Sequence, residues 1–239
     1  MGIKFCFYGT SCYDLILYAA RVLKHCKMSV LLLDSSKEQS LACAIPDVKG
    51  LEQGIRDYRG IAFSKDRVPI DIQRGDYDAT FQYFGEYPDR IEAGDYNFIV
   101  SDCELHTVNR LSELKSKLDT TEHFKLISVS ENDEQYEGME DDTFPKGCLN
   151  LIILGSEASS RKNYVASQFH VSPKECFFVD MDESNMECRI SCQYDTVFHF
   201  SKISDEFHDL VNKTCYSVLG TSINEKAYRK AYQKAERGK

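Results

Sequence analysis

The chain has 239 residues, of which 42% are hydrophobic and 28% charged, a globular mixture that argues against a disordered or fibrous protein. Its net charge of −9 disfavours broad nucleic-acid binding, because an acidic surface repels phosphates. No apolar run reaches 18 residues, and the first one is too short for a signal peptide, so we expect a cytoplasmic protein whose ten cysteines are reduced.

The first 34 residues predict a strand, a turn, a helix and a second strand in close succession. The apolar run 3–8 is typical of a buried strand, and 9–11 form the turn after it. Apolar residues recur at helical spacing over 13–26, and a second apolar run, 30–34, ends in an aspartate. This order is a βαβ unit, which predicts parallel strands joined by a right-handed crossover.

The rest of the chain continues the alternation of strands and helices. Further strands are expected at 68–72, 80–84, 98–100, 124–129, 149–154, 177–179 and 196–200. Helices are expected at 50–58, 107–118, 159–169 and 203–218. The pattern predicts one α/β domain over 1–221, with a doubly wound, mostly parallel sheet and helices on both faces.

Two segments differ from the rest in charge. Residues 222–239 hold six basic and two acidic residues, whereas 130–144 hold seven acidic residues and no lysine or arginine. The tail predicts a helix, 224–238, with a thin apolar side, which leaves three roles open: packing on a partner or on the chain itself, weak contact with a membrane surface, or solvation. Candidate partner contacts are Tyr13, Glu137, Asp141, Tyr228 and Tyr232.

The turn after the first strand is where a doubly wound fold binds phosphate, because free backbone N–H groups and the helix dipole point there. A phosphate loop needs several glycines and a lysine. Here Gly9, Thr10 and Ser11 supply one glycine, and the first lysine after the turn is Lys24, at the far end of the helix. Asp14 would repel an anion and is better read as a helix-start residue. The turn therefore lacks the chemistry of an ordinary phosphate site.

Aspartates end two of the strand candidates. Asp34 follows the second strand and Asp102 follows the strand at 98–100. An aspartate at such a position can hold Mg²⁺ through water, or it can accept hydrogen bonds from the next turn. Without a phosphate loop the second role is favoured, and Asp102 is the candidate if any magnesium binds.

Other chemistry has little support in the sequence. There is no Gly-x-Ser-x-Gly elbow for acyl transfer. His106 is the one histidine worth testing as an acid or base, although a surface role is favoured. Cys188, Cys192 and His199 do not make a convincing set of four zinc ligands.

In chain order, several segments resemble the MinD/ParA family of deviant Walker-A ATPases. Residues 4–9 and 29–34 resemble its opening strands, and 95–102, ending in Asp102, resembles its Walker-B strand. Residues 150–154 resemble the strand that leads to its base-binding region. Residues 177–180 with Arg189 downstream, then 194–198 and the helix expected at 203–218, resemble its last strand and closing helix. The resemblance implies a doubly wound domain that dimerises through its nucleotide face and docks on a larger machine.

The departures from that family concern its ATP-binding residues. Its Walker A loop reads Lys-Gly-Gly-x-Gly-Lys-[Ser/Thr], whereas 10–14 here is shorter and has neither lysine. Ser36 stands where the family has its switch I aspartate, and only Asp34 and Asp102 match by position. The resemblance therefore implies a pseudo-ATPase with no cofactor, and ATP with Mg²⁺ only if the altered site still binds.

Three functional hypotheses remain. The first is a non-catalytic scaffold or regulator that helps position a secretion, pilus or flagellar-type machine, or partners an active paralogue. A homodimer is possible for it, and such a dimer would form without ATP. The second is a nucleotide-binding enzyme, a weak or unusual ATPase, that uses the turn 9–11 without a lysine. The third is a likeness of fold only. The second predicts a deep pocket near Gly9, Asp34 and Asp102, whereas the first predicts that Tyr13 and its neighbours fill that space.

Overall fold

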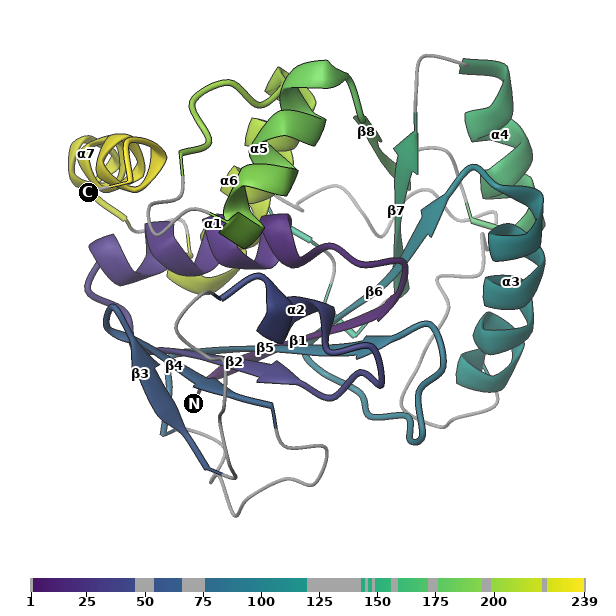
Figure 1. The fold of residues 1–239 in the computed structure, drawn as a ribbon, viewed down its shortest axis with the longest axis horizontal. Coiled ribbons are helices and arrows are strands. Elements are labelled where there is room, and N and C mark those ends of the chain that lie inside the picture. Colours follow the sequence, from purple (N-terminus) through teal and green to yellow (C-terminus); the bar gives the residue numbers. More distant parts are fainter. Residues whose placement is uncertain are drawn as a thin grey trace, which may run out of the picture.

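A twisted β-sheet forms the centre of the molecule (Figure 1). The computed structural model describes residues 2–45, 54–65, 76–119, 143–144, 146–147, 149–155, 159–171, 176–194, 199–220 and 223–238. Within these ranges eight strands pair in the order β3-β4-β2-β5-β1-β6-β7-β8. All neighbours are parallel except β3 and β4, which confirms the doubly wound, mostly parallel sheet.

The strands are short and mostly buried. They are β1 (Ile3–Gly9), β2 (Val30–Asp34), β3 (Arg56–Tyr58), β4 (Ile61–Ser64), β5 (Ala79–Gly85), β6 (Tyr96–Asp102), β7 (Leu149–Gly155) and β8 (Cys176–Asp180). The helices are α1 (Tyr13–His25), α2 (Ser40–Cys43), α3 (Leu105–Asp119), α4 (Ser159–Gln168), α5 (Glu183–Tyr194), α6 (Asp205–Leu219) and α7 (Glu225–Glu236).

Alternation along β1 divides the core into two layers. Phe5 and Phe7 point to one face, where they pack with α1 and α6, while Cys6 and Tyr8 point to the other, where they pack with α3 and α4. The ring of Phe5 stacks on Phe81 at 4.8 Å between centroids, and an aromatic pair of this kind adds about 0.5–1.5 kcal/mol beyond its buried area. Helices therefore cover both faces, as expected (Figure 1).

Most of the predicted elements within the described ranges are present. The first βαβ unit and the strands expected at 80–84, 98–100, 149–154 and 177–179 are confirmed, as are the helices expected at 107–118, 159–169 and 203–218. Sequence reasoning missed α2, β4 and α5. The strands at 68–72 and 124–129, the acidic residues up to 142, and 196–198 lie outside the described residues; 199–200 are not in a strand.

The helix expected at 50–58 is wrong where it can be checked. Residues 56–58 form β3, which pairs antiparallel with β4. The connecting residues Arg59 and Gly60 have φ values of +52° and +78°. Positive φ at both positions is typical of a two-residue hairpin turn, whose twist matches that of the flanking strands.

The basic tail forms a helix that packs on the rest of the chain. α7 begins after Asn224, whose side chain accepts a hydrogen bond from the Ala227 N–H, a typical N-cap. Tyr228, Ala231 and Ala235 are buried and α7 contacts α1. None of the helices in the described ranges has the length and apolar character needed to cross a membrane. The division of the chain at residue 222 stays a prediction.

Candidate functional site

The first strand–helix turn is tight and is held against the neighbouring strand. Three residues, Thr10 to Cys12, join β1 to α1. Gly9 has a φ of +102°, and a Cβ there would lie 2.2 Å from the Val100 carbonyl oxygen of β6. The Thr10 N–H donates to that same oxygen at 2.8 Å. Glycine is required here, and one backbone donor that could face a phosphate is already used within the sheet.

A guanidinium from α5 covers this turn. Arg189 donates to Asp14 Oδ1 at 2.9 Å and to the Ser11 carbonyl oxygen, and it lies 4.7 Å from the centre of the Tyr13 ring. The Asp14 side chain is 2% exposed and that of Arg189 is 14% exposed. Burial opposes the guanidinium charge, but Asp14 and Tyr13 outweigh it, so the pKa of Arg189 is raised. The cation is therefore already paired with an anion of the chain.

Two buried tyrosines, Tyr13 and Tyr83, make hydrogen bonds near the turn. The Tyr13 hydroxyl donates to the Arg189 carbonyl oxygen at 2.8 Å and accepts from Gln193 Nε2 at 2.5 Å. The Tyr83 hydroxyl donates to the Gly9 carbonyl oxygen at 2.8 Å. Both side chains are buried, and burial raises the pKa of Tyr13 to about 12. The Tyr83 hydroxyl thus contacts Gly9 directly, whereas the Tyr13 hydroxyl is hydrogen-bonded to α5.

Asp34 is used to hold the segment after β2. Its Oδ1 accepts from the Ser36 N–H (3.1 Å) and hydroxyl (2.6 Å), and its Oδ2 accepts from the Ala42 N–H (2.8 Å). It is fully buried, and burial raises its pKa against the opposing effect of these hydrogen bonds. In this arrangement the carboxylate fixes the start of α2, and Ser40 of α2 accepts a hydrogen bond from the Ser11 hydroxyl (2.9 Å).

Asp102 begins α3. Its Oδ1 accepts from the Glu104 N–H at 2.9 Å and its Oδ2 from the Thr107 hydroxyl at 3.4 Å. The carboxylate is partly exposed, as its position at the end of β6 suggests. The structure gives it the hydrogen-bonding role that the sequence analysis favoured.

One side-chain oxygen of the turn, Thr10 Oγ1, differs from the groups above in its hydrogen bonding. Thr10 Oγ1 is buried and has no hydrogen-bond partner within the described residues. A buried hydroxyl of this kind costs stability unless something completes its hydrogen bonding.

The other residues singled out from the sequence lie elsewhere. His106 is exposed, with Nδ1 3.2 Å from Glu104 Oε2. Across the ranges that the structure describes, no group of three or more metal-binding side chains occurs. The Tyr228 hydroxyl donates to Asn212 Oδ1 at 2.6 Å, and Tyr232 is partly buried against Phe200, so both pack inside the chain. Their role as partner contacts stays a prediction, and Glu137 and Asp141 lie outside the described residues.

Sequence reasoning did not find the pairing of Asp14 with Arg189, nor the contacts of Tyr83. Arg189 entered only as a residue downstream of a strand in the resemblance. The two charged residues are 175 positions apart. The only local signal was Asp14 itself, an acidic residue at an apolar helix start, which needs a partner if it is buried.

Comparisons with known proteins place the fold. A scan against protein-family models and a search of curated proteins give no match. Solved structures with a similar fold include a ParA family ATPase from Chlorobium tepidum, with 12% identity, a TM-score of 0.51, and coverage of 98% of this chain and 97% of that chain. A putative plasmid partition protein from Borrelia burgdorferi bound to AMPPNP shares 10% identity with a TM-score of 0.57, covering 93% of this chain and all (100%) of that one.

A chain of the MinC:MinD cell division protein complex of Aquifex aeolicus is similar to the same degree, with 10% identity, a TM-score of 0.57, and coverage of 93% and 98%. At this identity the likeness shows the fold. The chain has the α/β fold of the ParA/MinD P-loop ATPases, and the expected resemblance is confirmed at that level.

Proposed function

We propose that this chain is a pseudo-ATPase, a non-catalytic protein of the ParA/MinD fold that acts as a scaffold or regulator through protein–protein contacts. The observation that carries the proposal is the Asp14–Arg189 ion pair across the first turn. A functional phosphate loop needs unpaired positive charge at this place. Here the cation present is neutralised by an aspartate of the same chain.

The cost of placing a triphosphate there supports the proposal. Phosphate oxygens beside the turn would lie near the carboxylate of Asp14, and the first lysine after the turn, Lys24, is in the last turn of α1. Arg189 would have to leave Asp14, whose side chain would then be buried without a partner. Both changes oppose binding, so the residues present do not fit Mg·ATP as the family binds it.

The metal and water positions of the family are also altered. Asp34 is engaged by Ser36 and Ala42, and Asp102 by the first turn of α3. Ser36 has no carboxylate with which to orient an attacking water. We therefore propose that no cofactor is needed, and that the altered Walker A turn has become part of the core.

Protein contacts are the remaining way for such a fold to act. The Aquifex aeolicus MinD structure is a complex with MinC, so a protein of this fold can work by binding another. We propose the same for this chain, with a secretion, pilus or flagellar-type component or an active paralogue as partner, and a homodimer that forms without nucleotide. A cytoplasmic location and one domain over 1–221 remain part of the proposal. Because the apolar side of α7 is buried, membrane contact through it would be limited to surface charges.

A second candidate function rests on Thr10. Its buried hydroxyl without a partner in the described residues could bind a phosphate oxygen, and the similar Borrelia burgdorferi protein is bound to AMPPNP. On this alternative the chain is a nucleotide-binding enzyme that uses Gly9, Thr10 and Ser11 without a lysine.

Measurement of phosphate release from ATP distinguishes the pseudo-ATPase from the nucleotide-binding enzyme. The purified chain, with Mg²⁺ and millimolar ATP, is expected to release phosphate no faster than its Asp102→Asn variant. A rate that exceeds the variant's and falls on Thr10→Val would favour the enzyme.

A further inference from the structure

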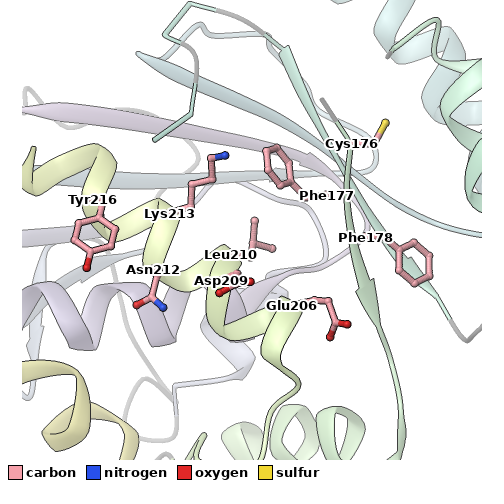
Figure 2. Close-up of a pocket in the computed structure, with 9 residues that line it drawn as sticks. All are labelled: Cys176, Phe177, Phe178, Glu206, Asp209, Leu210, Asn212, Lys213 and Tyr216. Atoms are coloured by element: carbon pink, nitrogen blue, oxygen red, sulfur yellow. The ribbon is translucent and has the colours of Figure 1, made fainter. Parts of the chain in front are cut away.

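A groove runs beside the last strand of the sheet, away from the first turn. Its volume is about 510 Å³ and it lies between β8 and α6 (Figure 2). Figure 2 shows the Phe177 ring pointing toward α6 while Phe178 points away from it. Phe177 and Leu210 supply apolar surface to the groove. Pockets of this size are ordinary for binding sites.

The strand that forms one wall has an edge. β8 is last in the strand order, and among the described residues it pairs only with β7. In a parallel ladder, alternate residues turn their N–H and C=O groups away from the partner strand. Such an edge is a template on which another strand can pair. The groove and the edge are contiguous, because Phe177 and Phe178 belong to both.

The opposite wall carries negative charge. Glu206 and Asp209 lie three residues apart on α6, are exposed, and line the groove. Lys213 also lines it, but its ammonium lies 5.1 Å from the centre of the Phe177 ring and 5.7 Å from that of Phe144. The basic charge is therefore held against aromatic rings, whereas Glu206 and Asp209 are exposed side chains of the groove's α6 wall (Figure 2).

We propose that this groove docks an extended, basic segment of a partner protein, which adds to β8 as a further strand. Side chains of a strand alternate between its two sides, so the residues at every second position would face α6. Among these same positions, apolar residues would meet Phe177 and Leu210, and lysines or arginines would meet Glu206 and Asp209. The inference rests on the proposed function in one respect, that the chain works by binding protein, and it names the chemistry of the partner.

A displayed library of random peptides about ten residues long, the length of a long strand, provides the probe. After selection on the purified full chain, enriched peptides are expected to carry both apolar and basic residues at every second position, the positions that face α6. A synthetic copy of the best peptide is then methylated at single backbone nitrogens. Methylation of alternate positions should abolish binding, because those N–H groups pair with β8, and methylation of the others should not. Equal effects at both sets of positions would overturn strand addition.

Charge reversal locates the site. The Glu206→Lys/Asp209→Lys variant is expected to bind the selected peptide at least about tenfold more weakly. Glu187→Lys, an exposed change on α5, is the matched control and should bind as wild type. If the double charge-reversal variant does not fold, peptide binding is measured with the Glu206→Gln/Asp209→Asn variant in its place. Enriched peptides without a preference for basic residues would overturn the proposal, and so would equal binding of the peptide by all variants. The proposal would also be overturned if the chain itself self-associates through this groove and the Glu206→Lys/Asp209→Lys variant abolishes that self-association.

The outcome is independent of nucleotide chemistry. Failure of the peptide experiment would leave the reading of the first turn intact. Conversely, ATP hydrolysis would overturn the pseudo-ATPase proposal without altering what binds at β8.

Discussion

The carboxylate of Asp14 and the guanidinium of Arg189 lie 2.9 Å apart, although the two residues are 175 positions apart in the sequence. The pair joins the first turn of α1 to the middle of α5, beside the turn where a doubly wound fold ordinarily holds phosphate. The contribution of this ion pair to stability and the accessibility of the turn beside it can each be measured.

Substitution of Arg189 should lower the free energy of unfolding. Arg189→Gln leaves Asp14 buried without its ion partner, so we expect the unfolding free energy to fall by roughly 3 kcal/mol or more in urea denaturation. Arg229→Gln is the control, since Arg229 is exposed and its pair with Glu225 contributes about 0.5 kcal/mol or less.

Comparable losses for the two arginine variants would contradict the buried ion pair. The double variant Asp14→Leu/Arg189→Met should recover much of the loss, because it removes both charges together.

Cys12 reports on closure of the turn. Its side chain is buried and burial raises the pKa of its thiol, so we expect slow labelling by a maleimide at neutral pH. Cys43 is exposed and should label quickly. Peptide mass spectrometry measures both rates in one sample.

Arg189→Gln should speed the labelling of Cys12 and leave Cys43 unchanged. If Cys12 already labels as fast as Cys43 in the wild type, the turn is open in solution and a filled site is untenable.

The fold was predictable where the signal is local. β1, α1 and β2 follow each other with short turns, and their apolar runs leave little choice of structure. The hairpin of β3 and β4 was missed because Leu51, Ile55 and Tyr58 also fit helical spacing, and because Arg59 at positive φ is not a residue that signals a tight turn.

The site was predictable only in part. Asp34 and Asp102 were placed correctly at strand ends, because parallel strands bring their carboxyl ends to one edge. Their partners lie within eight residues, as with Ala42 for Asp34. Arg189 comes from α5, a helix that the sequence analysis did not identify, so its contact with Asp14 depended on the whole fold.

Docking of α7 should contribute to global stability. Tyr228 is 3% exposed and its ring packs 4.7 Å from that of Tyr216. We expect Tyr228→Ala to lower the unfolding free energy by about 3 kcal/mol or more, as for other large buried rings. Tyr194→Ala, at a side chain that is 77% exposed, should change it by less than about 0.5 kcal/mol. An unchanged melting temperature for Tyr228→Ala would mean that α7 is undocked in solution.

His208 should make stability depend on pH. It shares a 2.6 Å hydrogen bond with the Tyr232 hydroxyl. Burial lowers its pKa, against the opposing effects of Glu236 on α7 and of Asp205 and Asp209 on α6.

Because the unfolded chain binds this proton more readily, the contribution of His208 is complete above about pH 6.5 and is lost as the pH falls below that value. His208→Gln should flatten the pH dependence of the unfolding free energy between about pH 6.5 and 5. An equally steep dependence in this variant would exclude His208 as its source.

Calorimetric titration of the purified chain with Mg·ATP and Mg·ADP tests the central claim most directly. A ligand at 100 times its dissociation constant would stabilise the fold by about 2.7 kcal/mol, so a thermal melt at millimolar nucleotide provides a second readout. We expect neither heat of binding nor a shift in melting temperature, because Arg189 is already paired with Asp14 and lies over the Tyr13 ring. Saturable binding that Thr10→Val weakens would contradict the account and identify the turn as a working nucleotide site.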